Sequence, residues 1–169
     1  MTVRRWMVLV LLLLVLTLVF QVVRTRNLLE ASRLLHQVEQ VSVSLAASGR
    51  ANPAIYWNHV EFMEMARGLN PVDSRILLAE GSQYLLLGRP EEAVEVYRRA
   101  LEIEPRPEIY LNLGRAEAAA GQLEEARESF RRAAALDPRN WRLIPQELRP
   151  SQVPGKRPTA RRKRPRRSP

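Results

Sequence analysis

The feature of this sequence that most restricts its fold is a segment that occurs twice, 33 residues apart. Residues 91–101 read EEAVEVYRRAL, and residues 124–134 read EEARESFRRAA. A period of roughly 20 to 50 residues is typical of repeat proteins, in which each repeat is one supersecondary unit that packs against its neighbours. We therefore predict consecutive helical repeats. The same offset relates three further pairs of residues: Gly81 and Gly114, Gly88 and Gly121, and Pro105 and Pro138.

Each copy has the residue types that two closely packed helices need. Small residues such as Gly81 and Ala93 allow two helices to approach each other, whereas a larger side chain would hold them apart. Aromatic residues at equivalent positions, Tyr97 and Phe130, fill the space between neighbouring helices. Proline cannot continue a helix, so Pro105 and its counterpart in the next copy end one helix and force a turn.

Over residues 71–138 the sequence resembles the tetratricopeptide repeat family, whose units are helix–turn–helix pairs. The resemblance implies an all-α fold with repeats over 72–105 and 106–138. Glu80 departs from the family pattern, which usually has Leu there, and Glu117 stands where an aromatic residue is usual. The residues that carry the resemblance are Gly81, Tyr84, Ala93, Tyr97, Ala100 and Pro105 in one copy, and Tyr110, Leu113, Gly114, Ala126, Phe130, Ala133 and Pro138 in the next.

Residues 27–71 are predicted to form a degenerate third helix pair. Two repeats rarely suffice, because each buries its apolar face only against a neighbour. Pro71 lies 34 residues before Pro105, and in this register His59, Met63 and Ala66 take the places of Ala93, Tyr97 and Ala100. We therefore expect a helix over 55–69 and a partner helix over 27–48, which together with the two repeats make a short α-solenoid of about three helix pairs.

Residues 1–26 are predicted to be a membrane anchor. Trp6 to Val23 is an apolar run of 18 residues broken only by Thr17 and Gln21, and a helix of about 20 apolar residues spans a bilayer core of roughly 30 Å. A cleaved signal peptide is the alternative, but no small-x-small cleavage pattern follows the run. The transmembrane helix, about 6–23, either continues into the first repeat helix or ends at a break that Asn27 caps.

Arginine pairs flank the apolar run, with Arg4 and Arg5 before it and Arg24 and Arg26 after it. With the terminal amine, the positive charge is slightly greater before the run, which favours an N-terminus on the cytoplasmic side. We therefore predict a single-pass protein of a bacterial-type inner membrane, with the repeats on the periplasmic or outer side.

The two C-terminal segments differ in character. Residues 139–150 are expected to form a short cap in which Trp141, Leu143 and Ile144 cover the last repeat, with Pro145 limiting its length. Residues 151–169 are rich in Pro, Arg and Lys and are predicted to be a disordered, basic tail.

The sequence contains no motif typical of catalysis, of cofactor binding or of metal binding. It contains no cysteine, and its two histidines, His36 and His59, are 23 positions apart. The acidic pairs of the repeats, such as Glu125 and Glu128, are followed three and four residues later by Arg131 and Arg132, so solvated ion pairs explain them. We therefore predict a protein that is not an enzyme.

The remaining hypothesis is a binding surface for a protein. In the tetratricopeptide repeat family the first helix of each pair lines a concave groove for a peptide or a partner helix. Leu78, Ser82 and Leu111 depart from the set of residues with which the family binds a C-terminal carboxylate, so a mixed apolar and polar groove is expected. The alternative is that the groove positions are ordinary surface. By register they are Arg75, Leu78, Ser82 and Leu85 in one repeat, and Glu108, Leu111, Arg115 and Ala118 in the next.

Two functions fit these features. The first is a membrane-anchored scaffold or adaptor that binds proteins through its repeats, as an accessory or assembly subunit of a larger membrane complex. The second is a membrane-tethered binder of anionic lipid headgroups or nucleic acid that acts through its tail, with nucleic acid less favoured because no aromatic residues are interleaved for base stacking. The predicted tail contacts are Arg161, Arg162, Lys163, Arg164, Arg166 and Arg167.

Overall fold

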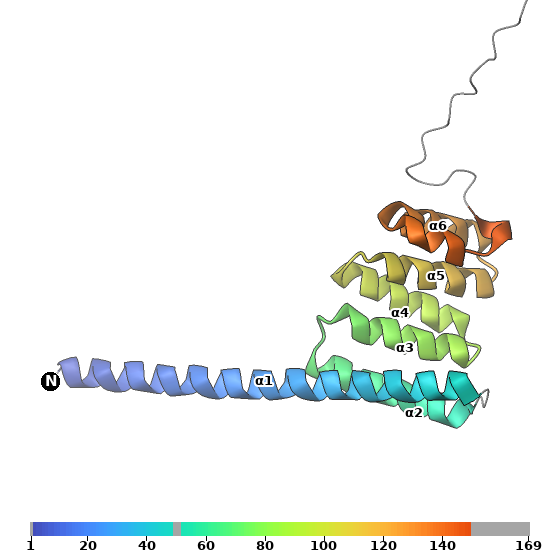
Figure 1. Cartoon of the computed structure of the whole chain (residues 1–169). Helices are drawn as coiled ribbons and strands as arrows, with labels where there is room; N and C mark the ends of the chain where they lie inside the picture. Colours follow the sequence, from blue (N-terminus) through green and yellow to red (C-terminus); the bar gives the residue numbers. More distant parts are fainter. Residues whose placement is uncertain (1, 49–51, 150–169) are drawn as a thin grey trace, which may run out of the picture. The chain divides into compact units, whose positions relative to one another are not determined.

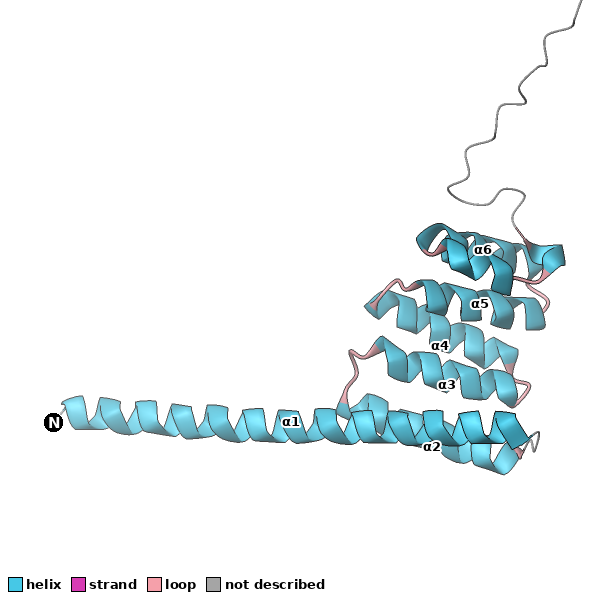
Figure 2. Cartoon of the chain, viewed as in Figure 1, coloured by secondary structure: helices cyan, strands magenta, loops and turns pink. Residues whose placement is uncertain are grey.

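The computed structural model describes residues 2–48 and 52–149, and all regular elements within these ranges are helical (Figure 2). The all-α fold, with a long apolar N-terminal helix followed by helical repeats, is confirmed. The elements are α1 Thr2–Ser48, α2 Pro53–Leu69, α3 Ser74–Leu86, α4 Pro90–Ile103, α5 Pro107–Ala119 and α6 Leu123–Leu136, followed by two 3₁₀ helices, η1 Pro138–Leu143 and η2 Gln146–Leu148 (Figure 1).

The chain divides into two compact units at the bond between Arg89 and Pro90. The first unit contains α1, α2 and α3, and the second contains α4, α5, α6 and the two 3₁₀ helices. The division falls within the predicted repeat 72–105, so the sequence repeat and the compact unit have different boundaries.

Helix α1 is a single helix of 47 residues that joins the apolar run to the first unit. No Pro or Gly occurs between residues 3 and 48, and Asn27 lies inside the helix rather than at its start. The side chains from Trp6 to Val23 are exposed, whereas Ala31, Leu35 and Val38 are buried. These three recur at helical spacing and pack in one apolar cluster with Met63 and Ala66 of α2 and Ile76 of α3.

Local sequence sets the ends of α2 and α3. Asn52 caps α2, its side chain accepting a hydrogen bond of 3.0 Å from the amide of Ala54, and Pro53 takes the first helical position. Asp73 caps α3 in the same way through the amide of Arg75, also at 3.0 Å. The helix expected over 55–69 is therefore found as α2, two residues longer at its start.

A buried polar chain links the three helices of the first unit. His59 of α2, 4 % exposed, has its Nδ1 3.1 Å from Oε1 of Gln83 on α3. The amide nitrogen of Gln83 donates to the hydroxyl of Ser42 on α1 at 3.4 Å. His59 thus lies in the core, where the repeat register places it, and its polar group has a partner.

In the second unit, α5 packs against both α4 and α6. Gly121 follows α5 with a φ of 78°, a left-handed conformation that ends the helix and that glycine adopts without strain. Gly114, in the middle of α5, lies against the ring of Phe130, which is fully buried. The predicted role of small and aromatic residues is confirmed at this contact.

The C-terminal segment covers part of the second unit, but not with all the residues that the sequence suggests. Ile144 is buried and Trp141 is partly buried against the same apolar cluster. Leu143 is 55 % exposed, so its predicted place in the cap is wrong, and Leu148 of η2 is buried instead. Ile144 and Pro145 are extended between the two 3₁₀ helices, and this step leads the chain into η2, which carries Leu148.

Candidate partner-binding face

The groove residues predicted on α3 share one helix face. Arg75, Leu78, Ser82 and Leu85 recur at intervals of three and four residues, and each is partly or largely exposed. The guanidinium of Arg75 binds the carboxylate of Asp73, with nitrogen to oxygen distances of 2.7 and 3.0 Å. The hydroxyl of Ser82 donates to the carbonyl of Leu78 at 2.9 Å. This face therefore presents two leucines beside an arginine whose orientation is fixed by an ion pair.

The groove residues predicted on α5 differ in exposure. Glu108 and Arg115 are exposed, and Ala118 is partly buried. Leu111 is 5 % exposed and belongs to the apolar cluster that includes Ile144 and Leu148 of the C-terminal segment. The expectation of an open groove position at Leu111 is therefore wrong in this structure, because the apolar core of the second unit includes that side chain.

The two sets of predicted residues fall in different compact units, α3 in the first and α5 in the second. The four residues of α3 share one partly exposed face, whereas on α5 Leu111 is buried and the other three are at least partly exposed. A single groove that runs across both helices stays a prediction. The predicted tail contacts, from Arg161 to Arg167, lie outside the described residues.

A buried carboxylate joins the three α-helices of the second unit. Glu117 of α5 is 3 % exposed, and its Oε2 accepts a hydrogen bond of 2.6 Å from the hydroxyl of Ser129 on α6. Its Oε1 lies 3.3 Å from Nη2 of Arg98 on α4. A charged group buried in this way is tolerated because it is paired and hydrogen-bonded, so we assign Glu117 a structural role.

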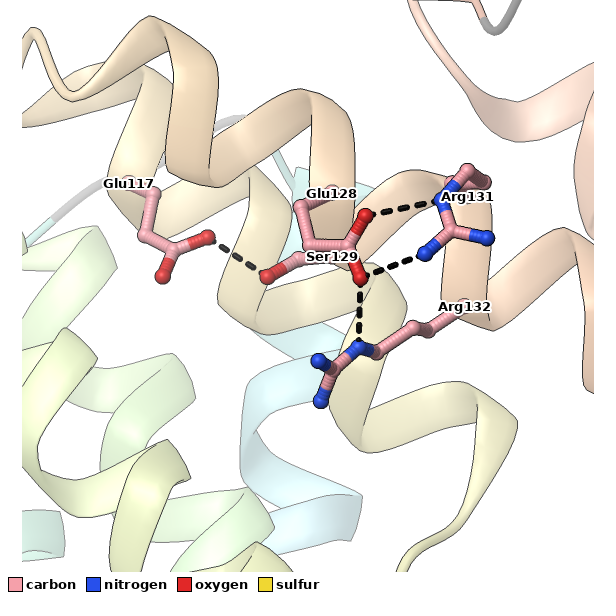
Figure 3. A network of polar contacts seen from close by, with 5 residues as sticks. All are labelled: Glu117, Glu128, Ser129, Arg131 and Arg132. Atoms are coloured by element: carbon pink, nitrogen blue, oxygen red, sulfur yellow. Dashed lines mark hydrogen bonds and ion pairs between the residues drawn. The ribbon is translucent and has the colours of Figure 1, made fainter.

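The acids and arginines of α6 form solvated ion pairs, as the sequence predicts. Oε1 of Glu128 lies 2.7 Å from Arg131 and 2.8 Å from Arg132 (Figure 3). Hydrogen bonds from Arg131 first and Arg132 second lower the pKa of Glu128 from its ordinary value of 4.5 to about 2. A carboxylate with this pKa stays ionised at neutral pH and is a poor general acid or base.

Among residues 2–48 and 52–149 no group of three or more His, Asp or Glu side chains lies in a position to hold a metal ion. Asp137, which caps η1, is an acid engaged by a neighbouring arginine. Its pKa is lowered by hydrogen bonds from the side chain and then the backbone of Arg139.

A pair of adjoining hollows, which the sequence did not predict, lies along α1. One follows α1 from Gln21 and Val22 to Arg33, with a volume of about 520 Å³. The other, of about 570 Å³, lies between α1 and the end of α2, where Met65 and Leu69 line it. The second hollow has no sequence motif because it depends on how α2 folds back on α1, whereas the first is lined by residues of α1 alone.

A cation–π cluster in the first unit is a further feature that no sequence motif predicts. The guanidinium carbon of Arg89 lies 5.0 Å from the ring centre of Trp57 and 5.6 Å from that of Tyr84. These residues join the start of α2 to the end of α3, and exposed pairs of this kind contribute about 0.5–1 kcal/mol.

The N-terminal part of α1 is long and apolar enough to cross a membrane. The candidate span extends over Trp6–Ser42, with a mean hydropathy of 2.9 in its most apolar window. None of that window is buried within the described chain, whereas a core helix of a soluble protein is mostly buried.

Comparison with known proteins supports the tetratricopeptide repeat family for the helical repeats. The family model described as "Tetratricopeptide repeat" matches residues 64–108 and 78–140. No curated protein matches the sequence significantly. The two family matches overlap and together span α3 to α6, the helices that carry the sequence repeat.

Solved structures with the same fold come from distant proteins. The Arabidopsis OM64 TPR domain matches with a TM-score of 0.58 at 22 % identity, covering 68 % of this chain and 88 % of that one. The first TPR domain of human RPAP3 matches with a TM-score of 0.57 at 20 % identity, covering 66 % and 81 %. The Yersinia enterocolitica secretion chaperone SycD, in complex with a peptide of the translocator YopD, matches at 0.52 and 20 %, covering 64 % and 82 %. At these identities the similarity is one of fold.

Proposed function

We propose that this protein is a membrane-anchored adaptor that holds a protein partner on its repeats, close to the membrane surface. The observation that carries the proposal is the single helix α1, whose apolar residues up to Val23 are exposed while Ala31, Leu35 and Val38 lie in the core of the first unit. One continuous helix thus serves both as the proposed anchor and as part of the binding domain.

The fold supports the choice of a protein as the ligand. Tetratricopeptide repeats are protein-binding modules, and SycD, which shares this fold, is seen with a peptide of its translocator. The face of α3 offers Leu78 and Leu85 for apolar contact, with the ion pair of Arg75 and Asp73 beside them, a mixture that suits a partner with both apolar and polar side chains. We place the adaptor in a larger membrane complex, because α1 would hold the adaptor and its bound protein at the same bilayer.

Photo-cross-linking in membranes tests the adaptor role. Benzoylphenylalanine in place of Leu85 on α3 or Arg115 on α5 should form adducts with one and the same protein. The same probe at Glu102, which is exposed on α4, is the matched control and should not capture it. Equal capture from all three positions, or none from the first two, would contradict binding by these faces.

Extraction of membranes tests the anchor separately. Carbonate at high pH removes peripheral proteins but leaves helices that span the bilayer. We expect the full chain to remain in the membrane pellet. Release into the supernatant would exclude the anchor while leaving the cross-linking result intact.

A further inference from the structure

Three exposed large apolar side chains belong to segments at one end of the first unit. Leu29 of α1 is 67 % exposed, Met65 near the end of α2 is 47 % exposed, and Val72 in the loop after α2 is 73 % exposed. Exposure of several large apolar side chains to water is energetically unfavourable, and an exposed apolar surface of this kind marks a contact surface. Together with Arg26 and Arg33 of α1 we call these residues the proximal edge.

The topology places the proximal edge next to the apolar segment of α1. Helix α2 folds back along α1, and the hollow between them is lined by Glu30 and Arg33 of α1 and by Met65 of α2. The loop joining α2 and α3 lies beside the middle of α1, on the side of its exposed N-terminal part (Figure 1). The hollow on α1 continues from there down to Val22, so the edge and the apolar run form one surface.

The unbroken helix fixes how far the edge stands from the end of the apolar run. At about 1.5 Å per residue, Leu29 lies roughly 9 Å and Arg33 roughly 15 Å beyond Val23 along the axis. Helical side chains lean toward the N-terminus, which here means toward the apolar run, so the long Arg33 side chain reaches several ångströms closer. A headgroup layer is about 5–8 Å thick on each side of a bilayer, and typical tilts of about 20° lower one side of a helix further.

The chemistry of the edge matches this depth. Arg26 and Arg33 offer guanidinium donors to phosphate oxygens, and the aliphatic part of an arginine side chain tolerates apolar surroundings while its charged end stays in a polar layer. Glu30 is the acid between them, and its carboxylate lies 3.7 Å from Arg26, so the balance of the three charges stays positive. Apolar side chains beside arginines are the composition of surfaces that settle at the boundary of headgroups and acyl chains.

We propose that the proximal edge rests in the phospholipid headgroup layer of the bilayer that α1 crosses, with Leu29, Met65 and Val72 toward the acyl chains and Arg26 and Arg33 on phosphate groups. The inference rests on the proposed function, since it requires α1 to be inserted. It assigns the first unit a second attachment to the membrane, which fixes the rotation of this unit about the axis of α1 as well as its height.

The experiment uses the absence of cysteine from the sequence, so that single cysteines can be labelled without other changes. Val72→Cys and Met65→Cys full-length proteins carry an environment-sensitive nitrobenzoxadiazole dye in vesicles of phosphatidylcholine and phosphatidylglycerol. Lipids brominated near the headgroup should quench both dyes. Ala54→Cys, exposed at the opposite end of α2, is the matched control and should keep its fluorescence.

A label at Leu14→Cys separates the two proposals. If that label is quenched by lipids brominated deep in the acyl chain while Val72 and Met65 behave like Ala54, the anchor stands and the edge lies in water, which overturns the inference. If the Leu14 label is not quenched either, the proposed anchor itself fails. If the dyes at Val72 and Met65 are protected from water only in native membranes and not in vesicles of pure lipid, a protein covers the proximal edge. The assignment to lipid is then wrong.

The arginines have their own readout. Arg26→Gln with Arg33→Gln should reduce quenching at Val72 in vesicles that contain phosphatidylglycerol, and added salt should reduce it in the parent protein. The quenching at Leu14 should not change in either case. Equal quenching at Val72 with and without the arginines would remove the phosphate contacts from the proposal.

Discussion

At the scale of single residues, Gly114 shows how closely α5 and α6 approach each other. A Cβ atom at this position would lie 2.8 Å from Cδ1 and from Cε1 of Phe130, a distance that packed carbon atoms do not adopt. Because Phe130 is fully buried, its ring has no open space into which to move.

We therefore expect Gly114→Ala to lower the free energy of unfolding by about 1–2 kcal/mol, the cost of overpacking less the better helix propensity of alanine. Thermal unfolding of the detergent-solubilised protein, followed by circular dichroism, measures the change. Gly68→Ala is the matched control, because a Cβ there meets nothing within 4 Å and should leave stability unchanged or raise it. Equal stability of the two variants would show that α6 can shift away from α5.

Ser129 supports the buried carboxylate of Glu117, and its removal isolates that contact. We expect Ser129→Ala to cost about 1.5–3 kcal/mol of unfolding free energy, since it deletes a hydrogen bond to a charged acceptor that stays buried. The measurement is denaturant unfolding at pH 7. A double variant with Glu117→Gln should lose less than the sum of the two single changes, whereas strict additivity would mean that the two groups do not interact.

The ion pairs of Glu128 predict a small pH dependence of the free energy of unfolding that is confined to acidic pH. Its pKa in the folded chain, about 2, lies below its ordinary value of 4.5, so its contribution is fully present above pH 4.5 and is lost as the pH falls toward 2. The group is 40 % exposed, and exposed ion pairs contribute only about 0.2–1 kcal/mol.

Glu128→Gln should therefore be slightly less stable than the parent at pH 7 and equal to it near pH 2. Unfolding curves at the two pH values give the comparison. A difference that grows on acidification would contradict the assignment of the shift to Arg131 and Arg132.

At the scale of elements, α1 is the helix whose continuity has most consequence. Proline at position 27 would remove the hydrogen bond to the carbonyl of Val23 and kink the helix. The residues of α1 that enter the core begin at Ala31, so the first unit should keep its fold.

Spin labels at Leu14→Cys and Glu39→Cys should give a narrow distance distribution, centred near 37 Å for a straight helix. We expect Asn27→Pro to broaden and shorten that distribution, while Thr25→Ala, which keeps the helix, should not. A broad distribution in the parent protein would mean that α1 already bends between the apolar run and the unit.

The helices themselves were largely predictable from the sequence, because their limits depend on local chemistry. Proline at positions 90 and 107 begins α4 and α5, and the register of His59, Met63 and Ala66 places α2 correctly even though this pair lacks the usual residues. These residues are buried because they take the same places on the helix as the small and aromatic residues of the intact repeats.

The parts that were not predictable depend on contacts between distant segments. Leu148 rather than Leu143 enters the core, because the extended step at Ile144 and Pro145 sets the direction of η2. Leu111 is buried although its repeat position lines the groove in the family. Ser42 and Gln83 are 41 residues apart, and no spacing in the sequence pairs them.

At the scale of the whole molecule, the apolar run and the first unit share α1 but use different parts of it. Removal of residues 2–23 should leave a soluble, helical protein, because the core cluster uses α1 only from Ala31 onward. Removal of residues 2–40 should expose Met63, Ala66 and Ile76 and produce aggregation. Gel filtration and circular dichroism of the two truncations give the test. Aggregation of the shorter truncation would show that the apolar run contributes to the fold of the first unit.

Because α1 is long, the thickness of the bilayer can change the orientation of the first unit relative to the membrane. A span that is slightly too long for its membrane tilts, and a straight helix transmits that tilt without loss. Ser48 lies 25 residues beyond Val23, so a change of tilt of about 10° would move the far end of α1 sideways by roughly 6 Å. In the proposed anchored state, a thicker or thinner membrane would therefore change the direction in which the candidate face of α3 points. No contact between that face and a partner would have to change first.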